Sequence, residues 1–184
     1  MSDSNLSEEV LCREIVYGGK VISVARDVVK LPNGKNTFRE VAVHRPAVAI
    51  LPILNDGRIL LIRQYRHPVK RVIWEIPAGL LEEGEDPAGA AQRELREETG
   101  YRAGVLERGP SFFPSPGFCD EEIHVFIGKE LAQDPLDCDD DEFVRVESVS
   151  LEKALSMISS GEIVDGKTIL AILWLINSLG ISQR

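Results

Sequence analysis

A chain of 184 residues has the length of one compact domain, and its 43% hydrophobic and 28% charged residues exclude a disordered or fibrous protein. The 30 acidic and 21 basic side chains give a formal net charge of -9, which repels nucleic acid and anionic membranes at long range. Three widely spaced cysteines without a CxxC pair, Cys12, Cys119 and Cys138, favour neither a disulfide framework nor a zinc ribbon, so a cytoplasmic protein is expected.

Two turn signals organise the first third of the chain. LPNGK at 31–35 and LNDGR at 54–58 place an Asn-Gly or Asp-Gly pair between β-branched runs, a pattern that predicts β-hairpins. The alternation in VISVARDVVKL indicates a sheet with one half-exposed face. The predicted strands in this part are 10–17, 20–30, 36–44, 47–54 and 58–65.

The next element is a helix with well-marked ends. Asp86 can cap its free amides, Pro87 suits its first position, and Gly100 can end it in a left-handed conformation. The rest of the chain is predicted to form strands at 103–112 and 122–128, an acidic loop at 137–142, and helices at 150–160 and 166–179. The uncharged run at 168–181 is too short and interrupted for a membrane span and predicts a buried helix. This order predicts an α/β or α+β sandwich of a mixed sheet between helices.

The helix after Asp86 has an apolar stripe and an acidic stripe side by side. At about 100° per residue, the side chains that share the stripe expected to face the sheet are those of Ala88, Ala91, Leu95 and Thr99. The acidic stripe beside it contains Glu94, Glu97 and Glu98, which places three carboxylates at the rim of the buried face.

Like charges three and four residues apart repel each other, so this cluster requires an explanation. Mg²⁺ prefers oxygen ligands, and a rim of carboxylates that faces a cleft suits it. Arg93 can brace Glu97 four residues away. From the helix pattern alone, a solvated charged face with Arg93 and Arg96 as ion-pair partners remains the alternative.

The spacing around the helix carries a family resemblance. Gly79, five residues, Glu85, seven residues and then RELREETGY fill every specified position of the pattern GX5EX7REUXEEXGU, in which U is a bulky apolar residue. The segment resembles the Nudix box. The resemblance implies an α/β/α sandwich with a mixed central sheet and hydrolysis of nucleoside diphosphates linked to another moiety. It also implies two to three Mg²⁺ or Mn²⁺ ions as cofactors.

The resemblance assigns roles to individual box residues. Glu94, Glu97 and Glu98 match the metal ligands, and Ala78 matches a position whose backbone carbonyl often joins them. Glu85 matches the glutamate that supports the loop and helix. Gly79 and Gly84 are expected to allow the tight loop before the helix, and Arg93 matches the orienting arginine.

The flanks of the box resemble the ADP-ribose pyrophosphatase subfamily, which cleaves ADP-ribose to AMP and ribose 5-phosphate. The segments that carry this resemblance are RQYRHPVKRVIWEIPAG, FPSPGFCDEE with Pro116, and DDDEFVRVESVSLEKAL. Together with the box they cover roughly residues 38–176. Another nucleoside diphosphate sugar such as GDP-mannose, or an oxidised nucleotide, remains an alternative substrate. A non-catalytic ADP-ribose-binding module would be expected to lack a box glutamate or the loop acid.

The subfamily resemblance also implies the residues around the substrate. Glu142 matches the loop glutamate that acts as general base, with Asp140 or Glu97 as alternatives and a plain acidic turn as the non-catalytic interpretation. Arg66 matches an arginine that contacts the diphosphate, and its planar fork suits phosphate oxygens. Glu75 matches a substrate-side or metal-side glutamate.

Two further positions concern the nucleoside and the sugar. Phe38 lies where the subfamily often places an aromatic ring against adenine, although a strand phenylalanine can equally belong to a core. Gly117, with Ser115 and Phe118, would belong to a loop beside the terminal ribose, unless it serves turn formation alone.

The resemblance finally implies a domain plan and a partner. Residues 1–45 would form an N-terminal antiparallel β layer at the interface of a homodimer that exchanges this sheet, and residues 46–184 the Nudix hydrolase domain. The expected partners are a small nucleotide sugar and a second copy of the chain, with neither nucleic acid nor membrane.

Overall fold

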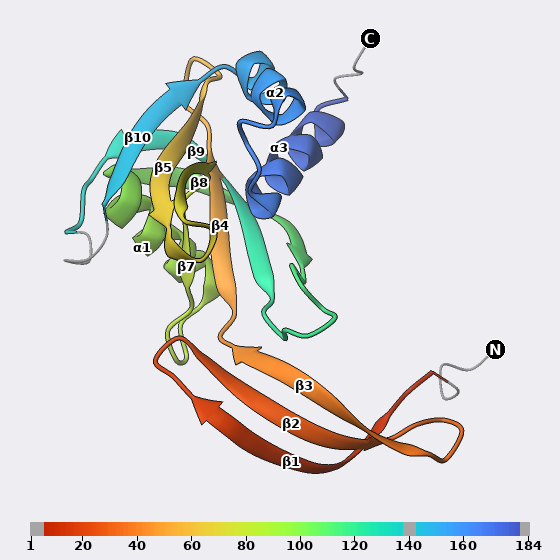
Figure 1. Cartoon of the computed structure of the whole chain (residues 1–184). Helices are drawn as coiled ribbons and strands as arrows, with labels where there is room; N and C mark the ends of the chain where they lie inside the picture. Colours follow the sequence, from red (N-terminus) through yellow and green to blue (C-terminus); the bar gives the residue numbers. More distant parts are fainter. Residues whose placement is uncertain (1–5, 138–142, 181–184) are drawn as a thin grey trace. The chain divides into compact units, whose positions relative to one another are not determined.

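A computed structural model of the chain describes residues 6–137 and 143–180 (Figure 1). The strands are β1 (Glu9–Gly18), β2 (Ile22–Lys30), β3 (Asn36–His44), β4 (Ala47–Pro52), β5 (Ile59–Arg66), β6 (Arg71–Glu75), β7 (Ala78–Leu80), β8 (Tyr101–Phe112), β9 (Ile123–Gln133) and β10 (Val144–Val149). The helices are α1 (Pro87–Thr99), α2 (Leu151–Ser160), α3 (Gly166–Ser178) and the short 3-10 helix η2 (His67–Val69).

The chain divides into two compact units. The first consists of Met1–Arg45 and Phe113–Glu122, and the second of Pro46–Phe112 and Ile123–Arg184. The segment 113–122 therefore belongs with the N-terminal strands, although it follows the second unit's β8 in the chain.

The first unit is built on the antiparallel sheet β1-β2-β3. The predicted hairpin at 31–35 is confirmed, because Leu31 N–H donates to Lys35 O at 2.8 Å and Gly34 adopts a φ of 81°. Segment 113–122 attaches to β3, where Ala42 N–H donates to Phe118 O at 2.7 Å. Asp120 Oδ1 accepts a hydrogen bond from His44 N–H at 2.8 Å, which fixes the far end of the same segment.

The second unit contains two sheets, one of four strands in the order β7-β4-β9-β8 and one of three in the order β10-β5-β6. Strands β4 and β9 are parallel and their other neighbours are antiparallel, so the four-stranded sheet is mixed, as predicted. The predicted β4–β5 hairpin is wrong. The turn at 54–58 forms, but among the described residues it is followed by a single isolated bridge, between Ile53 just after β4 and Ile59, and by no ladder between the two strands. Strand β4 already pairs with β7 and β9 on its two edges, so β5 joins the other sheet.

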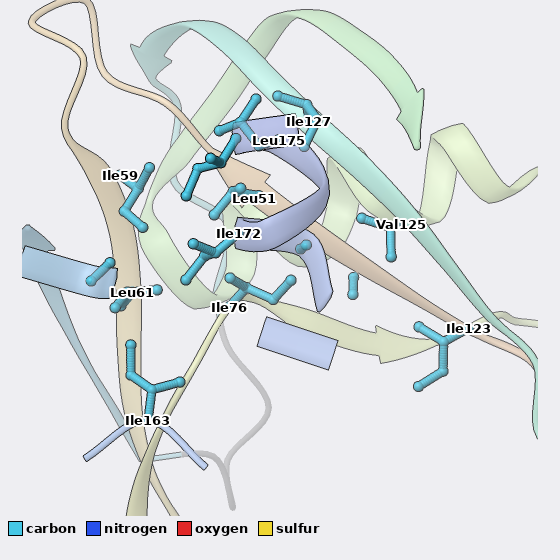
Figure 2. Packing of buried hydrophobic residues seen from close by; sticks show 14 of the residues in the cluster. Leu51, Ile59, Leu61, Ile76, Ile123, Val125, Ile127, Ile163, Ile172 and Leu175 are labelled. Carbon is cyan, nitrogen blue, oxygen red and sulfur yellow. The ribbon is translucent and has the colours of Figure 1, made fainter. Parts of the chain in front are cut away.

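Strand β4 is buried on both faces, which explains its continuous apolar sequence AVAIL. Ala47, Ala49 and Leu51 belong to the cluster that residues of α2 and α3 complete. Figure 2 shows Leu51 of this cluster together with Ile172 and Leu175 of α3. The alternate residues Val48 and Ile50 face α1, where they contact the cluster formed with Ala90, Ala91, Leu95, Ala103 and Phe126. The four-stranded sheet thus lies between helices, which is the expected α/β/α sandwich.

The ends of α1 are those that the sequence predicts. Asp86 Oδ2 accepts hydrogen bonds from Ala88 N–H at 3.1 Å and Gly89 N–H at 3.2 Å. Gly100 adopts a φ of 76°, and its N–H donates to Arg96 O. Caps at both ends set where α1 begins and ends, and packing against Val48 and Ile50 of β4 holds it on the sheet, so the positions of its acidic residues are fixed.

Three strands, β6, β7 and β10, were not among the predicted elements, and the sequences of the last two show why. Strand β7 is only the three residues AGL after a proline, and β10 follows directly on the acidic run. Strand β9 runs five residues beyond its predicted end at 128, to Gln133. Among the described residues, no helix is long and apolar enough to cross a membrane.

Candidate active site

The acidic residues of α1 are more buried than the sequence predicts. Glu94 is 8% and Glu98 3% exposed, whereas a rim position implies partial exposure. Only Glu97 keeps the rim position, with its side chain partly open to solvent. A buried carboxylate is costly unless cations or hydrogen-bond donors stabilise its charge, so the surroundings of Glu94 and Glu98 determine what this site can do.

Arg93 is the cation at the centre of this cluster. Its guanidinium donates to both carboxylate oxygens of Glu85 at 3.0 Å, to Glu94 Oε1 at 2.6 Å and to Glu97 Oε2 at 3.0 Å. A further N–H donates to Leu80 O at 3.1 Å. The predicted Arg93–Glu97 ion pair is present, but it is one of several. Arg93 therefore joins the loop before α1 to the helix itself.

These contacts also fix the charge state of the cluster. The hydrogen bonds with Glu85 raise the pKa of Arg93 further above its usual range, against the opposing effect of burial. The same bonds hold the pKa of Glu85 below its usual range. The arginine thus stays charged, and Glu85 stays ionised well below neutral pH.

Gly79 is required because it has no side chain, and not because of its backbone conformation. It is absent from the residues with positive φ, while Gly84 has a φ of 77°, so of the two only Gly84 needs a glycine conformation. A Cβ at Gly79 would lie 2.0 Å from the carboxylate of Glu94. The glycine at the start of the box therefore forms a cradle into which Glu94 fits.

Ala78 contacts the cluster through its amide group. Its N–H donates to Glu98 Oε2 at 2.9 Å, whereas the sequence resemblance implied a role for its carbonyl. This hydrogen bond stabilises the ionised form of the buried Glu98 carboxylate. Strand β7 thus supports both buried acids, Glu94 through Gly79 and Glu98 through Ala78.

The donor set suits a divalent cation. Glu94, Glu97 and Glu98 supply only carboxylate oxygens, which are the ligands that Mg²⁺ and Mn²⁺ accept. Within residues 6–137 and 143–180, no three His, Cys, Asp or Glu side chains are already grouped to hold a metal ion. Arg93 engages two of the three carboxylates, those of Glu94 and Glu97. The cradle at Gly79 and the bond from Ala78 keep the two buried acids at one edge of α1, where these residues would hold a cation.

A second charged cluster lies where β5 meets β6. Arg66 Nε donates to Glu75 Oε1 at 2.6 Å and its Nη2 to Glu75 Oε2 at 2.9 Å, a bidentate pair. Glu75 is 1% exposed. The sequence thus singled out two residues, Arg66 and Glu75, that the fold brings into direct contact.

The charges of this cluster are coupled to α1. Burial alone would raise the pKa of Glu75, but the bonds from Arg66 and the charge of Lys167 outweigh burial and lower it. Hydrogen bonding to Glu75 raises the pKa of Arg66, and the negative charge of Glu98 adds to this effect. Glu75 is therefore ionised at neutral pH, and Arg66 lies within electrostatic reach of Glu98, one of the two buried acids of α1.

The remaining described candidates lie in the first unit. Phe38 is 64% exposed on β3, which removes the interpretation that it belongs to a core. Gly117 lines a groove of about 450 Å³ within the same unit. The other residues of this groove are Arg39, Glu40, Val41, Phe113, Pro116, Phe118, Cys119 and Asp120. The groove thus combines exposed aromatic rings with charged side chains.

Two sequence candidates are not covered by the structure. Glu142 and the alternative base Asp140 lie outside the described residues. The structure instead adds three residues that sequence reasoning missed, namely Asp165, Lys167 and Thr168 at the start of α3. The only signal for them was an aspartate before a predicted helix, which indicates a cap and no role in a site.

The chain is similar in sequence to known proteins of one family. The family model NUDIX domain matches residues 43–170. The chain is 46% identical to an ADP-ribose pyrophosphatase of Bacillus subtilis (strain 168) over 93% of this chain and 94% of that protein. It is 42% identical to a methanol dehydrogenase activator of Bacillus methanolicus over 91% of this chain and 92% of that protein.

A solved structure shares the fold. The crystal structure of an ADP compounds hydrolase superposes with a TM-score of 0.86, covers 95% of each chain and is 23% identical. At this identity the likeness supports the α/β/α architecture alone. The box, the fold and the match over 43–170 agree, and the chain belongs to the NUDIX family.

Proposed function

We propose that this chain hydrolyses the pyrophosphate bond of ADP-ribose or a related ADP-sugar and releases AMP and a sugar phosphate. The observation that carries the proposal is the complete box, in which Glu94, Glu97 and Glu98 share one edge of α1 and Arg93 braces Glu94 and Glu97. The similarity to an ADP-ribose pyrophosphatase along almost the whole chain supports the choice of substrate.

The reaction requires an activated water, neutralised phosphates and a stabilised leaving phosphate. Two to three Mg²⁺ or Mn²⁺ ions would supply this chemistry when Glu94, Glu97 and Glu98 hold them. Arg93 keeps the carboxylates aligned through its bonds to Glu94 and Glu97. Glu85 anchors Arg93 in turn, so the loop supports the ligands without contacting the substrate.

Arg66 is the residue that we assign to the diphosphate. Its Nε and Nη2 face Glu75, which fixes the plane of the guanidinium. The side chain remains partly exposed, and a planar fork of N–H groups suits phosphate oxygens. Glu75 acts in this proposal by holding Arg66 on the substrate side of the site.

The nucleoside and sugar are assigned to residues of the first unit. Phe38 offers an exposed ring for adenine, and stacking of this kind contributes about 1–3 kcal/mol. Gly117 leaves the groove wall open, because nothing lies within 4 Å of the position that a Cβ would take there. Its loop is assigned to the terminal ribose.

Glu142 is proposed as the general base, on the resemblance of the surrounding DDDEFVRV to the loop acid of the subfamily. A base must be deprotonated, so its loss should remove the acidic limb of the pH-rate profile. We expect Glu142→Gln to lower kcat by about 10²–10⁴-fold and to abolish that limb. Glu147→Gln on β10 is the matched control and should keep it. A limb that persists in Glu142→Gln would transfer the role to Asp140 or Glu97.

A homodimer that exchanges the N-terminal sheet is proposed as the assembly. All ten residues of β1 are exposed in the single chain. Large apolar side chains are prominent among the exposed residues of β1 and its surroundings, namely Val10, Leu11, Ile15, Val16, Tyr17, Val21 and Ile22. An exposed apolar strand on a sheet is unfavourable in water unless a partner covers it, and a second copy supplies a matching strand.

The dimer is tested by its mass in solution. Ile15→Glu places a charge on the exposed apolar strand and is expected to halve the mass measured by light scattering at micromolar concentration. Leu173→Glu on α3 is the control, because it changes an exposed leucine of the second unit. A wild-type monomer, or an Ile15→Glu variant with the wild-type mass, would refute the proposed interface.

The activity is tested with the purified chain, a panel of substrates and product identification. We expect AMP from ADP-ribose or ADP-glucose with Mg²⁺ or Mn²⁺, and none after chelation with EDTA. Cleavage of GDP-mannose or an oxidised nucleotide in preference would keep the family chemistry and change the substrate. Tight binding of ADP-ribose without any product would identify a binding module instead.

A second candidate function comes from the similarity to a methanol dehydrogenase activator. In this proposal the chain raises the methanol oxidation rate of a methanol dehydrogenase. The test adds the wild-type chain or Glu98→Gln to that dehydrogenase and measures the rate. Activation by the wild type alone would connect the second function to the hydrolytic site, and activation by neither would remove it.

A further inference from the structure

Lys167 is a nearly buried cation whose partners lie beside the proposed substrate site. Its side chain is 11% exposed, and its Nζ contacts Glu75 Oε2 and lies 3.1 Å from Asp165 Oδ1. An ammonium group leaves water only when carboxylates compensate its charge. The place of Lys167 is therefore set by Glu75 on β6 and Asp165 before α3.

The first turn of α3 is fastened to the end of β6 by a second contact. Ile76 N–H donates to Thr168 Oγ1 at 2.8 Å, and Thr168 Oγ1 donates to Asp165 Oδ2 at 2.6 Å. Asp165 Oδ2 also accepts from Thr168 N–H at 3.0 Å as the helix cap. Lys167 and Thr168 thus contact two consecutive residues, Glu75 and Ile76, so α3 cannot shift without moving the carboxylate.

Glu75 receives cations from two directions. Arg66 bonds to both of its oxygens from β5, and Lys167 contacts Oε2 from α3. Arg66 uses Nε and Nη2 in this pair, so its Nη1 edge is directed elsewhere. The orientation of the Arg66 guanidinium depends on the orientation of the Glu75 carboxylate. Lys167 holds that carboxylate from α3, whereas Arg66 contacts it from β5.

We infer that Lys167 is a positioning residue for substrate binding: it holds Glu75 from α3 and so orients Arg66 toward an anionic phosphate group. The inference rests on the proposed function, in which Arg66 binds the diphosphate. Lys167 itself does not touch the substrate. A supporting contact of this kind typically changes affinity or activity by about 10–100-fold when it is removed.

The test compares Lys167→Met, which keeps the length of the side chain without its charge, with Lys167→Arg, which keeps the charge. We expect Lys167→Met to raise the KM for ADP-ribose about 10-fold with kcat changed less than about 3-fold, since it weakens binding in ground and transition state alike. Lys167→Arg should restore KM to within about 3-fold. Lys129→Met removes a lysine paired with Glu107 on the surface and should leave KM unchanged.

A second measurement separates positioning from a purely structural role. The Kd of the non-hydrolysable α,β-methylene analogue of ADP-ribose, with Mg²⁺, should also rise about 10-fold in Lys167→Met. In an Arg66→Gln background, the same substitution should have less than about a 2-fold effect, because Arg66 is the residue through which Lys167 acts. A full 10-fold rise in that background would overturn the inference.

A further variant separates a folding defect from a loss of substrate binding. Should Lys167→Met fail to fold because it leaves Glu75 with one cation, Glu75→Gln/Lys167→Met removes the buried charge as well and should show the raised Kd. An unchanged Kd in a folded variant overturns the inference. Absence of AMP from every substrate with the wild type would refute the proposed function instead, and the Kd comparison would still decide the role of Lys167.

Discussion

Glu98→Gln is expected to lower kcat for AMP release by about 10²–10³-fold, the loss of about 2.7–4 kcal/mol that follows when one electrostatic group is removed from a preorganised site. Glu98 is only 3% exposed, so solvent screens its charge weakly. The amide keeps the shape of the side chain, and its oxygen can still accept the hydrogen bond from Ala78 N–H. What the substitution removes is one negative charge from the group that would hold the cations.

Three measurements check this expectation. Steady-state release of AMP gives kcat, titration with Mn²⁺ gives the affinity for the metal, and thermal unfolding reports whether the fold is intact. Glu107→Gln is the control, because Glu107 is a carboxylate paired with Lys129 outside the site. Wild-type turnover in Glu98→Gln would contradict the ligand assignment. A loss of activity that accompanies a collapse in Tm would mean that Glu98 acts on stability rather than on the metal.

The sequence correctly predicted the helix ends and turns whose signals lie within a few neighbouring residues. The cap at Asp86, the glycine at Gly100 and the turn glycine at 34 each act within a few residues, and all three appear as expected. The β4–β5 pairing failed because it depends on β7 and β9, which reach β4 from distant parts of the chain. A turn signal specifies how the chain reverses, whereas the choice of sheet is made by competition among strands.

The same difference between local and long-range signals applies to the residues of the site. Fixed spacing within the box brought Arg93 and the three glutamates of α1 together, because they share one helix. The Arg66–Glu75 pair joins neighbouring strands, and only the family resemblance singled out both residues. Lys167 lies 92 residues from Glu75 along the chain, and no periodicity connects positions that far apart. The burial of Glu94 likewise depends on β7, which sequence reasoning did not predict as a strand.

Gly79→Ala tests the cradle that β7 provides for Glu94. The added Cβ would lie 2.0 Å from two atoms of the Glu94 carboxyl group and 2.3 Å from the third, well inside van der Waals contact. Either the carboxylate or the strand must move. The carboxylate is the end of a flexible side chain, so we expect Glu94 to leave the cradle and the Arg93–Glu94 contact to break. A displacement of about 1 Å in a catalytic group can cost about 10²-fold in rate, and this is the expected loss in kcat.

Gly89→Ala supplies the matched control for that substitution. Gly89 lies in α1, nothing lies within 4 Å of the position that its Cβ would take, and alanine favours the helix by up to about 1 kcal/mol. Gly89→Ala should therefore keep wild-type activity and raise Tm slightly, whereas Gly79→Ala should lose about 1–3 kcal/mol of stability by overpacking together with its activity. Full activity in Gly79→Ala would mean that Glu94 reaches the substrate site from outside the cradle. The glycine that opens the box would then serve the fold alone, and Glu97 and Glu98 would remain as the carboxylates that define the metal site.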